Sequence, residues 1–185
     1  MRKSTALLAL AAFVLGGLVA AWTLRGVPLP AQAPTGAERP AWTEVAWPFP
    51  IDQWGKGKAY RCQASDCGTE VNVYIRAKIG FCDCTAGVSD DEELDRIGDL
   101  DLFGSTLAPL GPGRPISVAW MKGRSRPFRL PSAQSALSVG FNDRCDAIIA
   151  TAVVGQRQPV AIEGAVLEFL NSKTVIRWAE VTLGL

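Results

Sequence analysis

The sequence predicts one small α+β domain, an antiparallel sheet covered by C-terminal helices, behind an N-terminal membrane helix or signal peptide. Three observations lead to this prediction. Residues 71–79 alternate between apolar and polar side chains, as a β-strand with one apolar face does. Residues 162–183 carry apolar side chains at helical spacing. Residues 1–24 join two basic residues to a long apolar run, which is typical of export or membrane insertion.

The composition agrees with a folded domain and excludes several kinds of protein. The 185 residues are 48% hydrophobic and 20% charged, as in packed domains. The chain has 19 Lys and Arg residues and 18 Asp and Glu residues, so its net charge is too small to attract nucleic acid. The absence of histidine excludes a Ser-His-Asp triad and any site that needs a His ligand. Carboxylate, thiolate, lysine or tyrosine chemistry stays open, but no motif indicates it. We therefore expect no cofactor and no enzyme.

Residues 1–25 form the predicted membrane or export segment. An apolar run from Thr5 to Leu24 follows the basic start and has no charge until Arg25. At about 20 residues it is just long enough to cross a bilayer. It is either an uncleaved anchor in the inner membrane or a signal peptide, cut for example before Trp22. Because positive charge stays cytoplasmic, we expect the rest of the chain in the periplasm, tethered as a single-pass protein or secreted after cleavage.

Residues 26–46 are predicted to be a linker, and residues 47–185 to be a disulfide-stabilised domain. Proline and glycine are frequent in the linker, which favours extended backbone. In the aromatic segment at the boundary, prolines exclude a helix interior and a central strand. Its aromatic side chains either pack over one end of the core or offer a surface to a protein partner or to the membrane interface. These side chains belong to Trp42, Trp47, Phe49 and Trp54.

The first hairpin is predicted from strands at residues 58–62 and 71–79, with turn residues between them. An oxidising compartment favours disulfides over free thiolates. With five cysteines, at least one is left over if all bonds are internal, and the sequence does not determine the pairing. The disulfide candidates are Cys62, Cys67, Cys82, Cys84 and Cys145.

The same cysteines support an alternative function in thiol redox chemistry or in the handling of copper or zinc. The cluster would consist of Cys62, Cys67, Cys82 and Cys84. Its spacing is not the C-x2-C pairing of structural zinc sites. A copper(I) site at the Cys-x-Cys pair would lack a nearby Met or His ligand. We therefore expect no metal site.

An acidic helix is predicted from Ser89 onwards. Ser89 and Glu92 have the spacing of a capping box, and the first turn is acidic, where the helix dipole favours negative charge. Helix capping and the helix dipole are a sufficient explanation for the run of acidic residues. The alternative is a calcium site at Asp95, Asp99 and Asp101, whose spacing departs from that of the known calcium loop.

Further strands are predicted at residues 116–120, 128–130, 137–141 and 147–154, giving a sheet of five or six strands before two C-terminal helices. A hairpin tip is predicted at residues 122–126. It begins the only basic cluster, which is either a solvated loop or a contact for an anion, a phosphate or an anionic lipid. The cluster consists of Lys122, Arg124, Arg126 and Arg129.

The sequence predicts a broad class of function and no specific activity. The chain has no nucleotide-binding loop and no nucleophile elbow. We expect a membrane-tethered or secreted periplasmic domain that interacts or assembles with other molecules without catalysis. The thiol-redox or metal-handling function is the alternative, and a carboxylate-based hydrolase has only the acidic helix in its favour.

Overall fold

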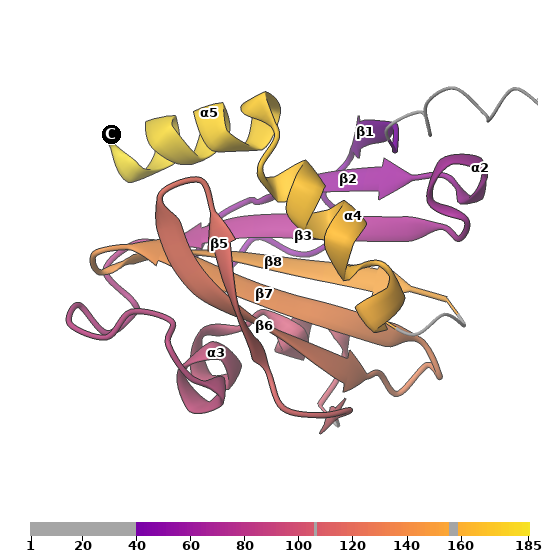
Figure 1. The fold of residues 1–185 in the computed structure, drawn as a ribbon, viewed down its shortest axis with the longest axis horizontal. Coiled ribbons are helices and arrows are strands. Elements are labelled where there is room, and N and C mark those ends of the chain that lie inside the picture. Colours follow the sequence, from indigo (N-terminus) through magenta and orange to yellow (C-terminus); the bar gives the residue numbers. More distant parts are fainter. Residues whose placement is uncertain (1–39, 106, 156–158) are drawn as a thin grey trace, which may run out of the picture. The chain divides into compact units, whose positions relative to one another are not determined.

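The computed structural model describes residues 40–105, 107–155 and 159–185, and these form an antiparallel sheet of eight strands with helices on both faces (Figure 1). The predicted membrane segment and most of the predicted linker lie outside the described residues. Within the described ranges, no helix is long and apolar enough to cross a membrane. The α+β fold with an antiparallel sheet is thus confirmed.

The sheet has the order β1-β2-β3-β8-β7-β6, and β5 and β4 both pair with the outer edge of β6. The first strands of the domain meet the last one where β3 pairs with β8. The strands are β1 (Trp42–Val45), β2 (Lys58–Cys62), β3 (Val71–Lys78), β4 (Ala108–Pro109), β5 (Arg114–Val118), β6 (Met121–Arg129), β7 (Ser135–Asp143) and β8 (Asp146–Val154).

Two strands differ from the prediction. β1 lies within the stretch assigned to the linker, so the sheet begins before residue 47. The predicted hairpin tip at residues 122–126 is wrong: these residues lie inside β6, and the turn is at Ala119, whose φ is 50°. Gly123 lies where an added Cβ would come within 2.0 Å of the Gly140 carbonyl oxygen. This glycine therefore allows close strand packing and does not mark a turn.

The first face of the sheet is apolar and is covered by the predicted C-terminal helices. The short helix η2 (Pro159–Ala161) leads into α4 (Glu163–Leu170), and α5 (Lys173–Leu183) follows. Val73, Phe141 and Ile148 are fully buried in the main hydrophobic core beneath them. Ser172 caps α5 by accepting a hydrogen bond from the backbone N–H of Val175, which satisfies one of the free N–H groups at a helix start.

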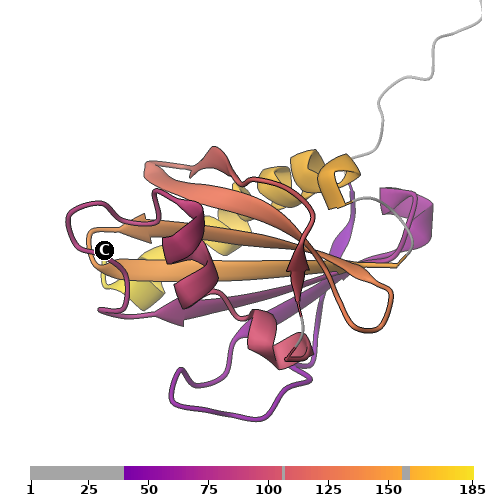
Figure 2. The same cartoon turned by 90° about the horizontal axis from the view of Figure 1, so that it is seen from below.

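The second face is covered by α3 (Asp91–Ile97) and η1 (Leu100–Phe103), on the opposite side of the sheet from α4 and α5 (Figure 2). Leu94 and Ile97 are fully buried in a second hydrophobic cluster. A Cβ on Gly140 would lie 2.8 Å from a Leu94 methyl group, so this glycine allows α3 to approach the sheet. On β3, Arg76 and Lys78 are buried on this face, so the strand is covered on both faces, whereas its alternating pattern predicts only one covered face.

The acidic helix begins one residue later than predicted. Its N-cap is Asp90, whose carboxylate accepts a hydrogen bond of 2.8 Å from the backbone N–H of Glu93. The Ser89–Glu92 capping box does not form. Aspartate and serine cap helices equally well, so the sequence does not separate the two registers.

Two disulfides form among the five predicted candidates. Cys62–Cys67, with an S–S distance of 2.06 Å, spans the short helix α2 (Ala64–Cys67) in the β2–β3 connection. Cys84–Cys145, at 2.08 Å, joins the loop after β3 to the β7–β8 turn. Cys82 is a buried free cysteine.

Serine replacement of both cysteines in each disulfide tests how much each bond stabilises the fold. The bonded residues are 61 positions apart for Cys84–Cys145 and 5 apart for Cys62–Cys67. Because closure of a longer loop restricts the unfolded chain more, we expect losses in the free energy of unfolding of about 4 and about 2 kcal/mol, respectively. Urea denaturation measures both losses. An equal or larger loss for the shorter loop would contradict this ranking.

Candidate functional site

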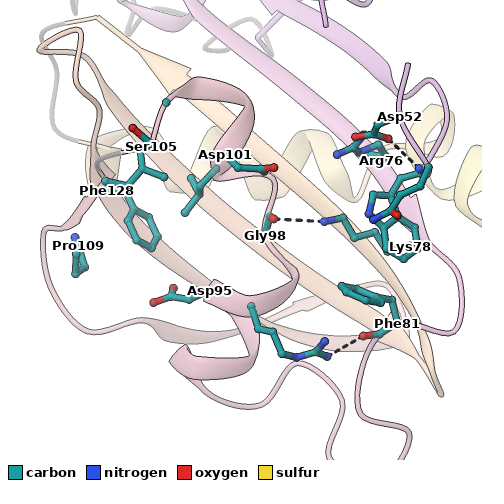
Figure 3. Close-up of a pocket in the computed structure, with 16 residues that line it drawn as sticks. Asp52, Arg76, Lys78, Phe81, Asp95, Gly98, Asp101, Ser105, Pro109 and Phe128 are labelled. Atoms are coloured by element: carbon teal, nitrogen blue, oxygen red, sulfur yellow. Dashed lines mark hydrogen bonds and ion pairs between the residues drawn. The ribbon is translucent and has the colours of Figure 1, made fainter. Parts of the chain in front are cut away.

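A cleft of about 720 Å³ opens on the second face of the sheet, bordered by α3, η1 and the segment that follows β1 (Figure 3). Its base includes side chains of β3. Its apolar lining comes partly from Leu107, Pro109 and Phe128. Its charged lining residues are Asp52, Arg76, Lys78, Asp95, Arg96 and Asp101.

A buried group of charges forms the wall of the cleft at β3. Asp99 accepts two hydrogen bonds from Arg76, of 2.9 Å from Nε and 2.6 Å from Nη2. It also pairs with Lys78, whose Nζ lies 2.8 Å from its Oδ1. The three residues are only 2–5% exposed. Asp52 completes the group through two contacts of 2.6 and 2.7 Å with Nη1 of Arg76. Two cations thus face two carboxylates, and the group is neutral.

The positions of these residues follow from local structure. Arg76 and Lys78 are two residues apart on β3, so their side chains point to the same face of the sheet. Asp99 lies between the end of α3 and the start of η1. The Gly98 carbonyl, at the end of α3, accepts a hydrogen bond of 3.3 Å from Lys78 Nζ. These contacts tie the α3–η1 connection to the centre of the sheet.

The pairing shifts the pKa of Asp52 and of Arg76. The hydrogen bond from Arg76 lowers the pKa of Asp52, although partial burial opposes this. Burial would lower the pKa of Arg76, but hydrogen bonds to Asp99 and Asp52 raise it above its usual value. Both groups are charged at neutral pH, and neither is poised to transfer a proton.

Aromatic rings form a further part of the wall. The rings of Trp54 and Phe81 pack with their centroids 4.5 Å apart. The Lys78 ammonium lies 5.4 Å from the Trp54 ring and 5.7 Å from the Phe81 ring. Arg96 covers Phe81 at 4.9 Å. Ring faces attract cations at such distances, so the rings and the charges hold one another in place.

Of the four aromatic residues predicted to contact a partner, Trp54 is the one that lines the cleft. Trp47 is buried and packs against Phe49, with ring centroids 5.3 Å apart. Trp42 stacks on Phe169 of α4 at 4.5 Å. None of the four predicted side chains is fully exposed. All four rings thus make contacts within the domain, Trp54 through Phe81, and the contact with a partner stays a prediction.

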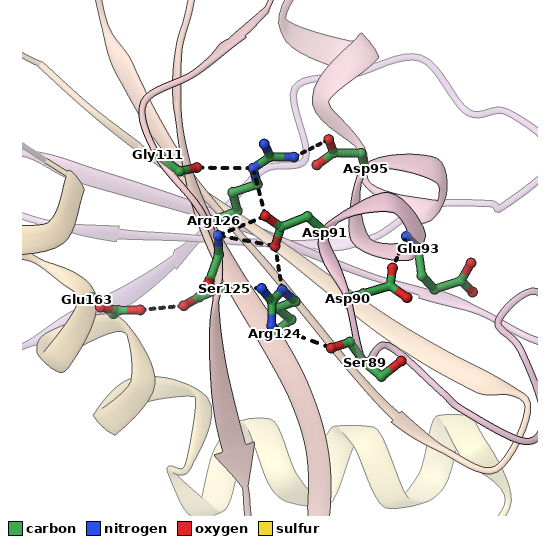
Figure 4. A network of polar contacts seen from close by, with 11 residues as sticks. Ser89, Asp90, Asp91, Glu93, Asp95, Gly111, Arg124, Ser125, Arg126 and Glu163 are labelled. Carbon is green, nitrogen blue, oxygen red and sulfur yellow. Dashed lines mark hydrogen bonds and ion pairs between the residues drawn. The ribbon is translucent and has the colours of Figure 1, made fainter.

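The predicted anion contacts do not form one site. Arg124 and Arg126 project from β6 toward α3 and pair with Asp91 and Asp95 (Figure 4). Arg126 Nε also lies 3.6 Å from an Asp91 oxygen. The other two candidates, Lys122 and Arg129, are exposed on the same strand. The basic strand and the acidic helix therefore neutralise each other across the second face.

Replacing Asp91 by Asn tests this pairing through pH. Hydrogen bonds from the Gly113 N–H and from Arg124 lower the pKa of Asp91 below its usual 3.8. The resulting stabilisation is present above pH 3.8 and is lost as the pH falls through the lowered pKa. We expect Asp91→Asn to weaken the fall in unfolding free energy on acidification below about pH 4.

Urea denaturation across this pH range measures the effect. The control is Glu92→Gln, which changes an exposed carboxylate of the same helix. An acid dependence that is the same in Asp91→Asn as in the unaltered chain would contradict the pairing.

The calcium alternative is not supported by the arrangement of its candidate ligands. Asp99 is occupied by Arg76 and Lys78, and Asp95 pairs with Arg126. Asp101 is exposed on η1. Over the described part of the chain, no three His, Cys, Asp or Glu side chains are arranged to hold a metal ion.

The cysteines of the predicted cluster lie at two separate places. Cys62–Cys67 precedes β3 and Cys84–Cys145 follows it, and this strand of eight residues is about 26 Å long. Cys82 lies beside the second disulfide and donates a hydrogen bond of 3.3 Å to the Arg144 carbonyl. Burial, with the nearby Glu93 carboxylate, raises the pKa of this thiol to about 11. At neutral pH it is a protonated, weak nucleophile.

The sequence does not predict the cleft. The one signal in the sequence is the pair Arg76 and Lys78 on the polar face of β3. If that face is covered, the two cations need carboxylate partners, and such partners would border a site.

Comparisons with protein-family models, with curated proteins and with solved structures gave no match to this chain.

Replacing Asp99 by Asn tests the buried group of charges. The amide keeps the shape of the side chain but leaves Arg76 and Lys78 without their shared anion. Breaking a buried ion pair from one side costs about 3–5 kcal/mol, so we expect a loss of that size in the free energy of unfolding. Urea denaturation measures it, with Asp101→Asn as the exposed control. Equal stability of the two variants would contradict a structural role for Asp99.

Proposed function

We propose that this protein is a non-catalytic binding domain that faces the periplasm, tethered to the inner membrane or secreted, and that its ligand or partner binds in the cleft on the second face. One observation carries the proposal: the cleft of about 720 Å³ has a wall of side chains that are already fixed by buried ion pairs. Small-molecule sites have volumes of about 300–1,000 Å³ and are usually formed before binding.

The chemistry of the lining favours binding over catalysis. Asp99 and Asp52 hold Arg76 and raise its pKa, so Arg76 cannot serve as a base, and Lys78 is held by Asp99. Trp54 offers a large, partly buried ring at the edge of the cleft. Aromatic side chains of this kind are enriched where proteins bind other molecules.

The proposed location rests on the N-terminal residues and on the disulfides. The basic start and the apolar run of residues 5–24 are typical of an anchor or a signal peptide. Two disulfides within the domain suit an oxidising compartment.

A C-terminal fusion to alkaline phosphatase, an enzyme active only after export, tests the location. We expect activity from the full chain, and its loss when residues 5–24 are deleted, because those residues supply the apolar segment. Assays in cells of a Gram-negative host measure both. Activity that is absent from the full chain, or unaffected by the deletion, would contradict export.

Photo-crosslinking in cells tests the cleft. A photoreactive amino acid replaces Gln53, which is exposed and lines the cleft. The control places it at Arg177, which is exposed on α5 over the first face. We expect a mass increase, from a bound ligand or partner, at position 53 and none at position 177. Adducts only at position 177, or at neither position, would contradict the proposed site.

A thiol-redox function is the second candidate, and one observation favours it. The free Cys82 lies against the Cys84–Cys145 disulfide, with its backbone N–H donating a hydrogen bond of 3.2 Å to the Cys145 carbonyl. Thiol titration of the native protein at pH 8 separates the candidates. A binding domain leaves the buried thiol unreactive until denaturant is added. Rapid reaction of native Cys82 would favour the redox function.

A further inference from the structure

Five of the six charged side chains that line the cleft are paired within the protein, and both signs of charge are among them. Arg76 and Lys78 pair with Asp99, and Arg96 pairs with Glu93 at 2.7 Å. On the other side of the cleft, Asp95 pairs with Arg126. A phosphate or carboxylate ligand would have to displace these carboxylates from their cations. The cleft therefore offers no surplus positive charge to an anion.

The remaining charge in the lining is negative. Asp101 is exposed on η1 and has no ion pair among the residues that the structure describes. A carboxylate in this state accepts hydrogen bonds from a ligand and repels an anion. Charge thus selects a ligand that carries no negative group.

The cleft presents both hydrogen-bond donors and acceptors. Lys78 has three N–H donors, and the structure gives it two oxygen partners, Asp99 and the Gly98 carbonyl. The side chains of Asp52 and Asp95 are 39% and 40% exposed and keep lone pairs open to a ligand. Hydroxyl groups both donate and accept, so a ligand with several hydroxyls matches this mixture.

Apolar surfaces lie beside these polar groups. The rings of Trp54 and Phe81 form one wall, while Leu107, Pro109 and Phe128 lie in the lining away from β3. A sugar ring has one face of C–H groups and an edge of hydroxyls, which is the combination that a ring wall next to carboxylates can bind. The volume of about 720 Å³ exceeds that of one sugar ring and leaves room for a short oligosaccharide.

We propose that the cleft binds a neutral sugar in the form of a short oligosaccharide, with its C–H face on Trp54, which Phe81 supports from behind, and its hydroxyls on Lys78, Asp52 and Asp101. This inference rests on the proposed binding function and names its ligand class. The carboxylates accept from the hydroxyls, and the Lys78 ammonium donates to a hydroxyl or ring oxygen.

Titration of the full chain, purified in a detergent without a sugar headgroup, tests the ligand class by tryptophan fluorescence and calorimetry. The neutral probes are maltotriose, cellotriose and the trimer of N-acetylglucosamine. The charged probes are trigalacturonate and inorganic phosphate. We expect saturable binding of at least one neutral trisaccharide and no binding of either anion.

Two variants place the binding in the cleft. Trp54→Ala removes the ring wall, and Asp101→Asn removes the unpaired exposed carboxylate without altering the core. Loss of a tryptophan ring that contacts the ligand weakens affinity by about tenfold or more, and we expect this for Trp54→Ala. We expect weaker binding in Asp101→Asn as well. The matched control is Trp120→Ala, an exposed tryptophan in the β5–β6 turn, which should bind like the unaltered chain.

The titration and the crosslinking experiment together distinguish a wrong ligand class from a wrong binding function. Binding of phosphate or trigalacturonate as tight as that of the neutral sugars overturns the inference, and so does the failure of all three neutral probes. If an adduct still forms at position 53 in the crosslinking experiment, the cleft is a binding site for another class of ligand. Equal loss of affinity in Trp54→Ala and Trp120→Ala also overturns the proposed site.

Discussion

The carboxylate of Asp99, held between Arg76 and Lys78, is the interaction on which the second face of this sheet depends. Charges this deeply buried are costly to remove from water and persist only when they are paired and hydrogen-bonded. The pairing joins the centre of β3 to the connection between α3 and η1. Without this pairing the α3–η1 connection loses its ion pairs to β3, while the apolar first face keeps its own core.

The two faces are stabilised in different ways. α4 and α5 cover the first face mainly through apolar packing, which has no directional preference, and Glu163 of α4 adds an ion pair with Arg114. α3 is held on the second face by buried Leu94 and Ile97 and by ion pairs with β6. Directional contacts fix side chains in one geometry, and fixed side chains are what a binding site needs. The second face therefore has the fixed polar side chains that a binding cleft requires.

Periodicity in the sequence predicts the elements that have a strong apolar pattern, and it fails where charged side chains replace that pattern. β3, β7, β8 and the two C-terminal helices follow from their spacing. β6 does not, because Arg124 and Arg126 look solvated until α3 supplies their partners. The pairing of Asp99 could not be predicted either, because 21 to 23 residues separate it from Lys78 and Arg76 and only the fold brings them together.

A double-mutant cycle between Arg76 and Asp99 tests the account most directly. The free energy of unfolding is measured for Arg76→Met, Asp99→Asn, the double variant and the unaltered chain. If the two side chains stabilise the second face as a pair, the double variant loses less than the sum of the single losses. We expect a coupling energy of about 1–3 kcal/mol. Losses that add to within about 0.5 kcal/mol would contradict it.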